Sequence, residues 1–121
     1  IDFDVSLAQS NMEDYIETVR ASVAKAHASS HVYTFGHVAD GNLHICVCVG
    51  TNDHDIRERV ERCVYEPLRT IEGSISAEHG IGLERKAFLE ISRSPAEVAA
   101  MRAIKSALDP GRILNPGKVF D

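Results

Sequence analysis

The chain has 121 residues, enough for one hydrophobic core but not for two independent ones. Its hydrophobic fraction of 44% excludes collagen-like and disordered classes, and no apolar run approaches the roughly 20 residues that span a bilayer. The net charge of −5, with no basic cluster to offset it, argues against a nucleic-acid or anionic-membrane partner.

The first residue is Ile1 rather than methionine and no secretory signal follows, so we expect a fragment or a processed chain. The cysteines form neither a CxxC pair nor an even disulfide framework. A reduced, cytoplasmic setting is therefore the simpler expectation.

The first elements are a strand and a helix. Residues 1–7 alternate between apolar and polar side chains, which predicts a half-buried strand. Ser10 to Glu13 then fits a capping box, in which a serine hydroxyl and a glutamate carboxylate bond the free amides of a helix start. The helix that follows has one apolar stripe and is expected to end near Ser29 and Ser30.

A hairpin comes next, with strands over 31–37 and 43–49 joined at Asp40-Gly41. Asp-Gly between strand-like runs is a strong hairpin signal, and a two-residue turn there pairs His37 with His44. Directly opposed residues share one face with Cβ atoms about 4.5–5.5 Å apart, so the two imidazoles could converge on one metal ion. This inference needs that register, because a slip of one residue sends the histidines to opposite faces.

The second half predicts a long helix that opens at Asn52 or Asp53 and is kinked or broken at Pro67, then a short extended segment over 74–77. A short helix over 84–91 and a helix opened by a capping box at 94–97 follow. The last helix carries an apolar stripe: Val98, Met101, Ile104 and Leu108. The order β-α-β-β-α-β predicts an α+β fold in one domain over 1–121, a ferredoxin-like antiparallel sheet with helices on one face and C-terminal helices after it.

Glu78 is the best candidate for a third metal ligand, because a carboxylate usually completes a pair of histidines and Glu78 borders a glycine-containing loop. Two histidines and one glutamate leave coordination positions open, which suits a catalytic metal. Zinc is the first expectation, with manganese and ferrous iron as alternatives. A regular ferredoxin-like sheet would carry Glu78 away from the hairpin, so the metal hypothesis predicts a departure from that fold.

Structural interpretations of the same residues stay open. The two histidines can be a packing pair, Glu78 can begin a helix, and Asp40 is more simply a turn residue than a ligand. Cys46 alternates onto the face of His44 and is expected near any site there, but nothing marks it as an activated thiolate. The other histidines lack partners in sequence and are expected to be solvated: His27, His31 and His54.

Three stretches, in matching order, resemble the C-terminal domain of FAD-linked oxidases. The family signature GHxGDGNLH is similar to residues 36–44, GSISxEHGIG to residues 73–82, and LDPxxxLNPGK to residues 108–118. The similarity extends over nearly the whole chain, and three ordered motifs are far more specific than one. This family includes D-lactate dehydrogenases, the glycolate oxidase flavoprotein subunit and D-2-hydroxyglutarate dehydrogenase.

The resemblance implies roles for these residues. His37, His44 and Glu78 match the metal ligands, usually assigned as zinc. His79 matches the histidine that contacts substrate and is proposed as general base, and Asn115 matches a position near the flavin. In the implied reaction the metal would bind the 2-hydroxyl group of the substrate and His79 would accept the proton of that hydroxyl. A hydride would pass from the substrate to flavin N5.

Two residues depart from the family pattern. Ala39 replaces a glycine, which is a mild change if that position has ordinary strand dihedrals. Cys46 stands where members that act on larger hydroxy acids carry a substrate-binding asparagine. The resemblance thus places Cys46 beside the substrate and favours a D-lactate- or glycolate-like acid over 2-hydroxyglutarate.

Members of this family bind FAD mainly through a separate N-terminal domain, and nothing in this chain resembles one. The resemblance therefore implies that the chain alone is inactive and exposes a former interdomain face that could promote homo-oligomers. Membrane association through a partner is compatible with the resemblance.

One hypothesis is that the chain is the substrate- and metal-binding half of an FAD-dependent 2-hydroxy-acid dehydrogenase. The alternative is a free-standing ferredoxin-like metal-binding or regulatory module, and only the first requires Glu78 to converge with His37 and His44. A metal-dependent hydrolase would leave the similarity of the tail unexplained.

Overall fold

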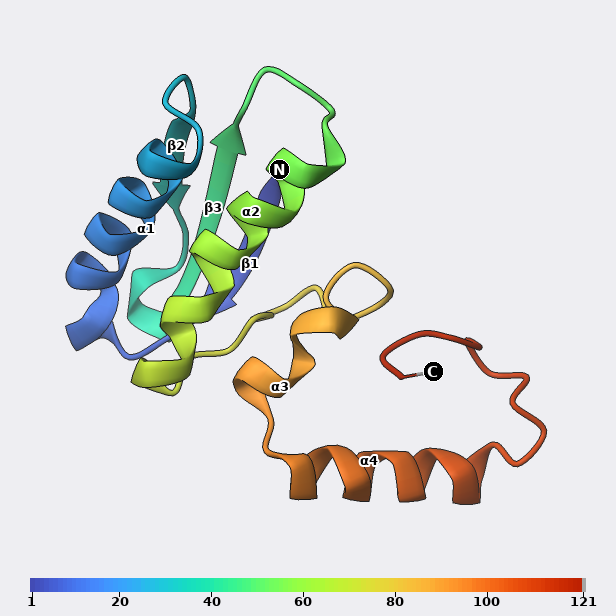
Figure 1. Ribbon diagram of the computed structural model, residues 1–121. Coiled ribbons are helices and arrows are strands. Elements are labelled where there is room, and N and C mark those ends of the chain that lie inside the picture. The colour runs from blue at the N-terminus through green and yellow to red at the C-terminus, as the bar shows by residue number, and fades with distance from the viewer. Residues whose placement is uncertain (121) are drawn as a thin grey trace.

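The computed structural model describes residues 1–120, and within them an antiparallel sheet has the strand order β1-β3-β2. The strands are β1 (Asp2–Ser6), β2 (His31–Phe35) and β3 (Asn42–Cys48). Helices α1 (Met12–Ala26) and α2 (His54–Tyr65) both cover one face of this sheet (Figure 1). The α+β class and the helices on one face are confirmed.

The core lies between the sheet and these two helices. Alternate side chains of β1 and β3 point toward the helices and are buried, as the period of a half-buried strand requires. The Tyr15 hydroxyl of α1 donates to the Val64 carbonyl oxygen of α2 at 2.8 Å, which satisfies a buried polar group. The fully buried members of the core include Val5, Val19, Val23, Ile45, Val47, Val60, Val64, Leu68 and Ile75.

Helix α2 begins where a side-chain cap was predicted. Asp53 is the N-cap residue, and its carboxylate accepts hydrogen bonds from the backbone N–H groups of Asp55 at 2.8 Å and Ile56 at 3.2 Å. The helix ends at Tyr65, and a 3-10 helix over Glu66–Ile71 carries Pro67 near its start, so the predicted break is confirmed.

The cap can be tested with a matched pair of variants. We expect Asp53→Ala to lower the free energy of unfolding by about 1 kcal/mol, because two amides at the start of α2 lose their acceptor. Asn52→Ala removes the neighbouring side chain, which makes no cap bond, and is expected to stay within about 0.5 kcal/mol of the parent. Urea denaturation of the two variants measures both values, and equal losses would contradict the assignment of the cap.

The predicted capping box at Ser10 to Glu13 is wrong. A 3-10 turn over Gln9–Asn11 precedes α1, and Asn11 is the N-cap residue without a side-chain bond. The backbone bond from the Asn11 N–H to the Ala8 carbonyl oxygen, 2.9 Å long, closes this turn, so Ser10 lies inside it rather than at an extended cap position. The helix also ends at Ala26, earlier than expected.

The predicted two-residue hairpin turn is also wrong. In the structure Phe35 pairs with His44, and a 3-10 turn over Val38–Asp40 belongs to the longer connection between β2 and β3. The His37 carbonyl oxygen accepts from the Asp40 N–H at 2.9 Å and from the Asn42 N–H at 3.2 Å, which closes the connection. Gly41 then takes φ 76°, and a Cβ there would lie 2.7 Å from the Leu7 carbonyl oxygen.

The fourth strand of the ferredoxin-like order is reduced to one bridge, between Ser6 and Ser74. Serine hydroxyl oxygens accept hydrogen bonds from backbone N–H groups that a regular strand would have paired with its neighbour. Ser92 Oγ accepts from the Ile75 N–H at 2.8 Å, and Ser74 Oγ accepts from the Ser76 N–H at 3.3 Å. Beyond this bridge the pairing is irregular, and the Ala77 N–H donates to the Asp4 carbonyl oxygen at 3.3 Å, so the segment stays beside β1. The last strand is thus very short, which is a departure from the regular fold of the kind that the metal hypothesis predicted.

The C-terminal part extends away from the sheet in Figure 1. In place of the helix expected over 84–91, a 3-10 turn at Lys86–Phe88 leads into α3 (Leu89–Ser92). The capping box at Ser94 is confirmed at the start of α4 (Pro95–Leu108). The apolar stripe of α4 is buried at its start, at Val98, but its C-terminal half does not face a core of this chain, because Ile104 and Leu108 are 60% and 76% exposed. Among the described residues no helix is long and apolar enough to cross a membrane.

Candidate metal and substrate site

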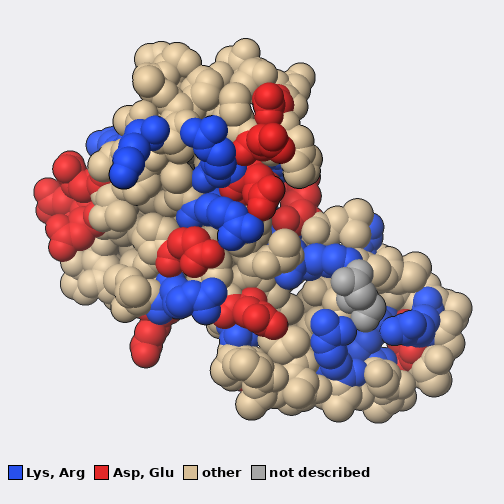
Figure 2. Space-filling view, viewed as in Figure 1, with Lys and Arg blue, Asp and Glu red and all other residues tan. Residues whose placement is uncertain are grey.

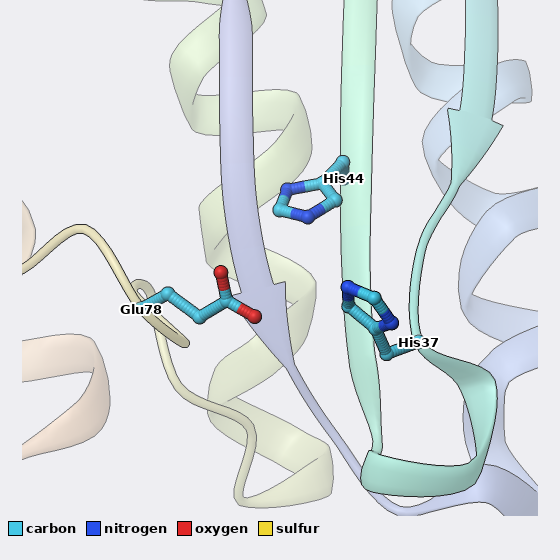
Figure 3. A group of neighbouring side chains, drawn as sticks. All are labelled: His37, His44 and Glu78. Atoms are coloured by element: carbon cyan, nitrogen blue, oxygen red, sulfur yellow. The ribbon is translucent and has the colours of Figure 1, made fainter.

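Three side chains converge on the sheet face that α1 and α2 leave open. His37 comes from the turn after β2, His44 from β3 and Glu78 from the segment that lies beside β1 (Figure 3). One ligand atom from each lies within 4.8 Å of the other two. The histidine rings are 6.5 Å apart between centroids. The pair converges although its register was predicted wrongly, because the 3-10 turn folds His37 back beside β3.

Glu78 is held by a second side chain. The Asn42 amide nitrogen donates to Glu78 Oε1, and Asn42 itself is almost fully buried. Glu78 lies in a loop and does not begin a helix, so that alternative is excluded. The hydrogen bond from the Asn42 side chain orients the Glu78 carboxylate toward the two histidines.

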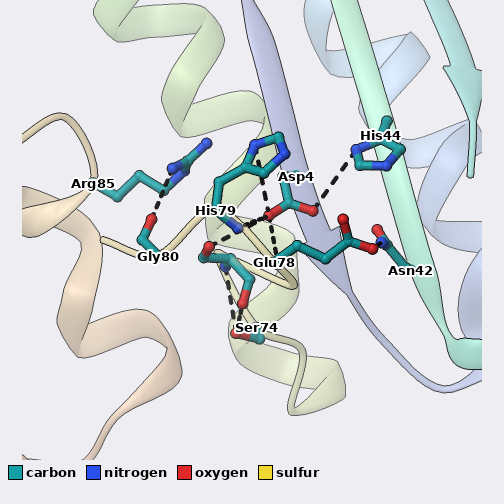
Figure 4. A network of polar contacts seen from close by, with 9 residues as sticks. Asp4, Asn42, His44, Ser74, Glu78, His79, Gly80 and Arg85 are labelled. Carbon is teal, nitrogen blue, oxygen red and sulfur yellow. Dashed lines mark hydrogen bonds and ion pairs between the residues drawn. The ribbon is translucent and has the colours of Figure 1, made fainter. Parts of the chain in front are cut away.

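Asp4 lies beneath this group, fully buried on β1 and directly opposite His44. Its Oδ2 accepts from the backbone N–H groups of Glu78 at 2.7 Å and His79 at 2.8 Å (Figure 4). Burial alone would raise the pKa of Asp4, but these two N–H groups and the nearby histidines lower it below its usual value. Asp4 is therefore a buried anion that holds the backbone of residues 78 and 79.

His79 follows Glu78 and turns its ring toward His44. The two rings are stacked, with centroids 5.9 Å apart and planes 24° from parallel. The His79 side chain is 59% exposed, so one side of the ring is open to a bound molecule. Its Nδ1 lies 3.9 Å from Asp4 Oδ2. The structure thus places the predicted base next to the predicted ligands.

Cys46 shares the open face with His44, as the alternation predicted, and pairs with Asp2 on β1 and Tyr33 on β2. A hydrogen bond with Asp2, followed by burial, raises the pKa of the Cys46 thiol to about 11. This shift favours the protonated thiol over the nucleophilic thiolate at neutral pH. Two aromatic side chains of β2, Tyr33 and Phe35, are 59% and 63% exposed on the same face.

Asn115 is not part of this group. It lies on the tail after α4 with φ 48°, and it lines a cavity of about 360 Å³ together with basic side chains. Figure 2 shows Lys and Arg gathered over this C-terminal part, whereas charges of both signs alternate over α2. The basic residues that line the cavity are Arg102, Lys105, Arg112 and Lys118.

A family model described as FAD linked oxidases, C-terminal domain, matches residues 1–119 of the chain. The chain belongs to this family. A D-2-hydroxyglutarate dehydrogenase of Xanthomonas citri is 42% identical over 98% of the chain, and one of Stutzerimonas stutzeri is 37% identical over 97%. The glycolate oxidase subunit GlcD of Bacillus subtilis is 35% identical over 97%. The chain covers 25–26% of the length of these relatives, so it spans about a quarter of each.

Two residues of this FAD-linked oxidase domain were missed from its sequence. Asp4 occupies a polar position of an alternating strand, which predicts solvent exposure, and its burial depends on a segment 74 residues later. Asn42 lies inside the GHxGDGNLH-like stretch, and its presence was attributed to the hairpin turn rather than to the site. A signal did exist for Asn42, because it projects from the same face of β3 as His44.

Proposed function

We propose that this chain is the substrate- and metal-binding part of an FAD-dependent 2-hydroxy-acid dehydrogenase, and that its 121 residues form one domain. The flavin would be held mainly by a domain outside the chain. The observation that carries the proposal is the convergence of His37, His44 and Glu78 beside His79, in a chain that belongs to the FAD-linked oxidase family.

The donor set fits a divalent metal. Two imidazole nitrogens and one carboxylate are ligands that zinc, manganese and ferrous iron accept, and three protein ligands leave room for substrate. Metal–ligand bonds of about 2.0–2.2 Å place neighbouring ligand atoms about 3–3.5 Å apart, so the three side chains would close in from their 4.8 Å limit. When bound, the ion would lower the pKa of the substrate's 2-hydroxyl.

His79 is the proton acceptor in this proposal. Its ring is next to His44 and half open to solvent, so a hydroxyl held beside the ligands would lie within reach of an imidazole nitrogen. Asp4 bonds the backbone N–H of His79 at 2.8 Å, which fixes the base relative to Glu78. FAD would accept the hydride from the substrate carbon.

In this proposal Cys46 influences which 2-hydroxy acid the site accepts. It lies on the same face as His44, two residues further along β3. Its protonated thiol is a weak hydrogen-bond donor and would bind the second carboxylate of a larger substrate poorly. A small acid such as D-lactate or glycolate therefore fits better than D-2-hydroxyglutarate.

Two further surfaces support a missing flavin domain. Tyr33 and Phe35 beside the site and the C-terminal half of the apolar stripe of α4 are exposed in this chain, as expected of faces that another domain covers. Asn115 adjoins a cavity lined by four basic side chains and one acidic one, Asp109, and this excess of positive charge suits the phosphates of a flavin nucleotide.

A chimera tests the function. This chain would replace the aligned segment of the Xanthomonas citri dehydrogenase, and anaerobic loss of the oxidised-flavin absorbance would be followed with D-lactate, glycolate and D-2-hydroxyglutarate. We expect a 2-hydroxy acid to reduce the flavin. The D-lactate to D-2-hydroxyglutarate rate ratio should rise by about tenfold over that of the intact host, since a lost amide contact weakens binding of the larger acid.

The matched control is Cys46→Asn in the same chimera, which restores the amide and should return the ratio toward that of the host. A chimera that binds FAD and is reduced by none of the three acids would contradict the proposed function. An unchanged ratio in both chimeras would contradict only the role of Cys46.

A further inference from the structure

Asp4 lies inside the site without being one of its proposed ligands. Its Oδ2 accepts from the N–H groups of Glu78 and His79, and the Ser76 hydroxyl donates to it at 3.4 Å. The other oxygen, Oδ1, is buried and has no hydrogen-bond partner in the part of the chain that the structure describes. One oxygen is thus committed to the backbone, and the second is left for another group.

That second oxygen faces His44. Asp4 Oδ1 lies 3.7 Å from His44 Nδ1, the contact drawn as a dashed line in Figure 4. The other ring nitrogen of His44 points to the side where His37 and Glu78 lie (Figure 3). The ring therefore lies between a buried carboxylate and the proposed metal position.

We infer that Asp4 is a positioning residue that selects the His44 tautomer with its proton on Nδ1, so that Nε2 is free to bind a divalent metal ion. An ionised carboxylate can only accept, so the nitrogen facing it carries the hydrogen. In a neutral imidazole the other nitrogen is then an acceptor and a ligand, as in carboxylate–histidine–zinc arrangements. The inference rests on the proposed function for the identity of the metal ligands.

The same carboxylate links the three parts of the site. Its Oδ2 fixes the backbone of Glu78, a ligand, and of His79, the base, while Oδ1 sets the ring of His44. Because the two backbone N–H groups need an acceptor, the orientation of any replacement amide at this position is determined. This makes Asp4→Asn a specific test.

In Asp4→Asn the amide oxygen must take the place of Oδ2, because the N–H groups of Glu78 and His79 point at it. The NH2 group then occupies the Oδ1 position and donates toward His44 Nδ1. His44 is forced into the opposite tautomer, with its proton on Nε2, where it blocks the metal. We expect the Zn²⁺ affinity of the chain to fall about 10- to 100-fold.

Two measurements on the full chain test this. Two-bond ¹H–¹⁵N correlation spectra at about pH 8, above the ordinary histidine pKa of about 6.5, report which ring nitrogen of His44 carries the proton without any metal. Titration calorimetry with Zn²⁺ alone reports the affinity. The matched control is Asp2→Asn, which makes the same change of charge on the same strand and face, one pleat away, and should alter neither readout.

A proton on Nδ1 in the parent and on Nε2 in Asp4→Asn, with slow amide exchange at residues 78 and 79 in both, supports the inference. A proton on Nε2 in the parent, or an unchanged tautomer in Asp4→Asn, overturns it. So does equal Zn²⁺ affinity in parent and variant when the parent binds zinc. If neither the parent nor the chimera binds metal, the metal part of the proposed function fails, and the tautomer spectra still decide the role of Asp4.

Discussion

Replacement of His79 by glutamine in the chimera is expected to slow flavin reduction by about 10²- to 10⁴-fold, the range typical of a lost general base. Glutamine keeps the approximate size of the side chain and a hydrogen-bonding amide but takes up no proton at neutral pH. The ring stacks on His44 rather than converging with the three candidate ligands, so the metal content should not change. Stopped-flow absorbance of the flavin and metal analysis of the same sample measure both quantities.

The control for His79→Gln is His31→Gln, which makes the same replacement at an exposed position on the far end of β2 and should leave the rate unchanged. A loss of less than about tenfold in His79→Gln would contradict the assignment of this residue as the base. A loss of rate together with loss of metal would assign His79 to the metal site instead.

Loss of a metal ligand should have a comparably large effect on binding. We expect the purified chain to bind about one equivalent of Zn²⁺, and His37→Ala and Glu78→Gln each to weaken that binding by at least about 100-fold, more than loss of a residue that only orients a ligand. Each replacement removes one of the three donors that lie within 4.8 Å of one another. Equilibrium dialysis with metal analysis measures the affinities.

His31→Ala is the matched control for His37→Ala, because it removes a histidine that lies outside the cluster. Far-ultraviolet circular dichroism shows whether each variant keeps its fold. Binding of zinc with equal affinity by the parent and both ligand variants would contradict the three-ligand site. Failure of both the chain and the chimera to bind zinc or manganese would contradict metal binding altogether.

Local sequence patterns predicted most of the elements because their causes are local. Alternation marked β1, Asp53 marked the start of α2, and the capping box at Ser94 marked the start of α4. The hairpin turn was predicted wrongly for an equally local reason. The backbone closes a 3-10 turn through the His37 carbonyl oxygen, and nothing in Asp40-Gly41 distinguishes this turn from a two-residue one.

The ligand set could be anticipated, but the residues that support it could not. His37, His44 and Glu78 stood out by residue type and by resemblance, whereas Asp4 looked like an exposed strand residue. Its burial arises because residues 77–79 lie over it beside β1, and the path of that segment depends on backbone N–H groups that donate to the hydroxyl oxygens of Ser74 and Ser92. A long-range path of this kind leaves no periodic signature in the sequence.

Helix α4 shows a different limit of periodicity. Its apolar stripe predicted a buried face, and in the structure the C-terminal half of that stripe is exposed. Periodicity reports that a face is apolar, but it carries no information on whether the covering surface lies in the same chain.

The bonds from Asp4 to residues 78 and 79 join points 74 and 75 positions apart in the chain. Contacts of such high sequence separation contribute to stability only after a long loop has closed. During synthesis, His37 and His44 emerge well before the segment that supplies the Glu78 carboxylate and lies beside β1. The three ligands are therefore complete only in a chain in which residues 78 and 79 already lie against Asp4 on β1. An ion would thus bind and stabilise the finished fold in preference to partly folded states.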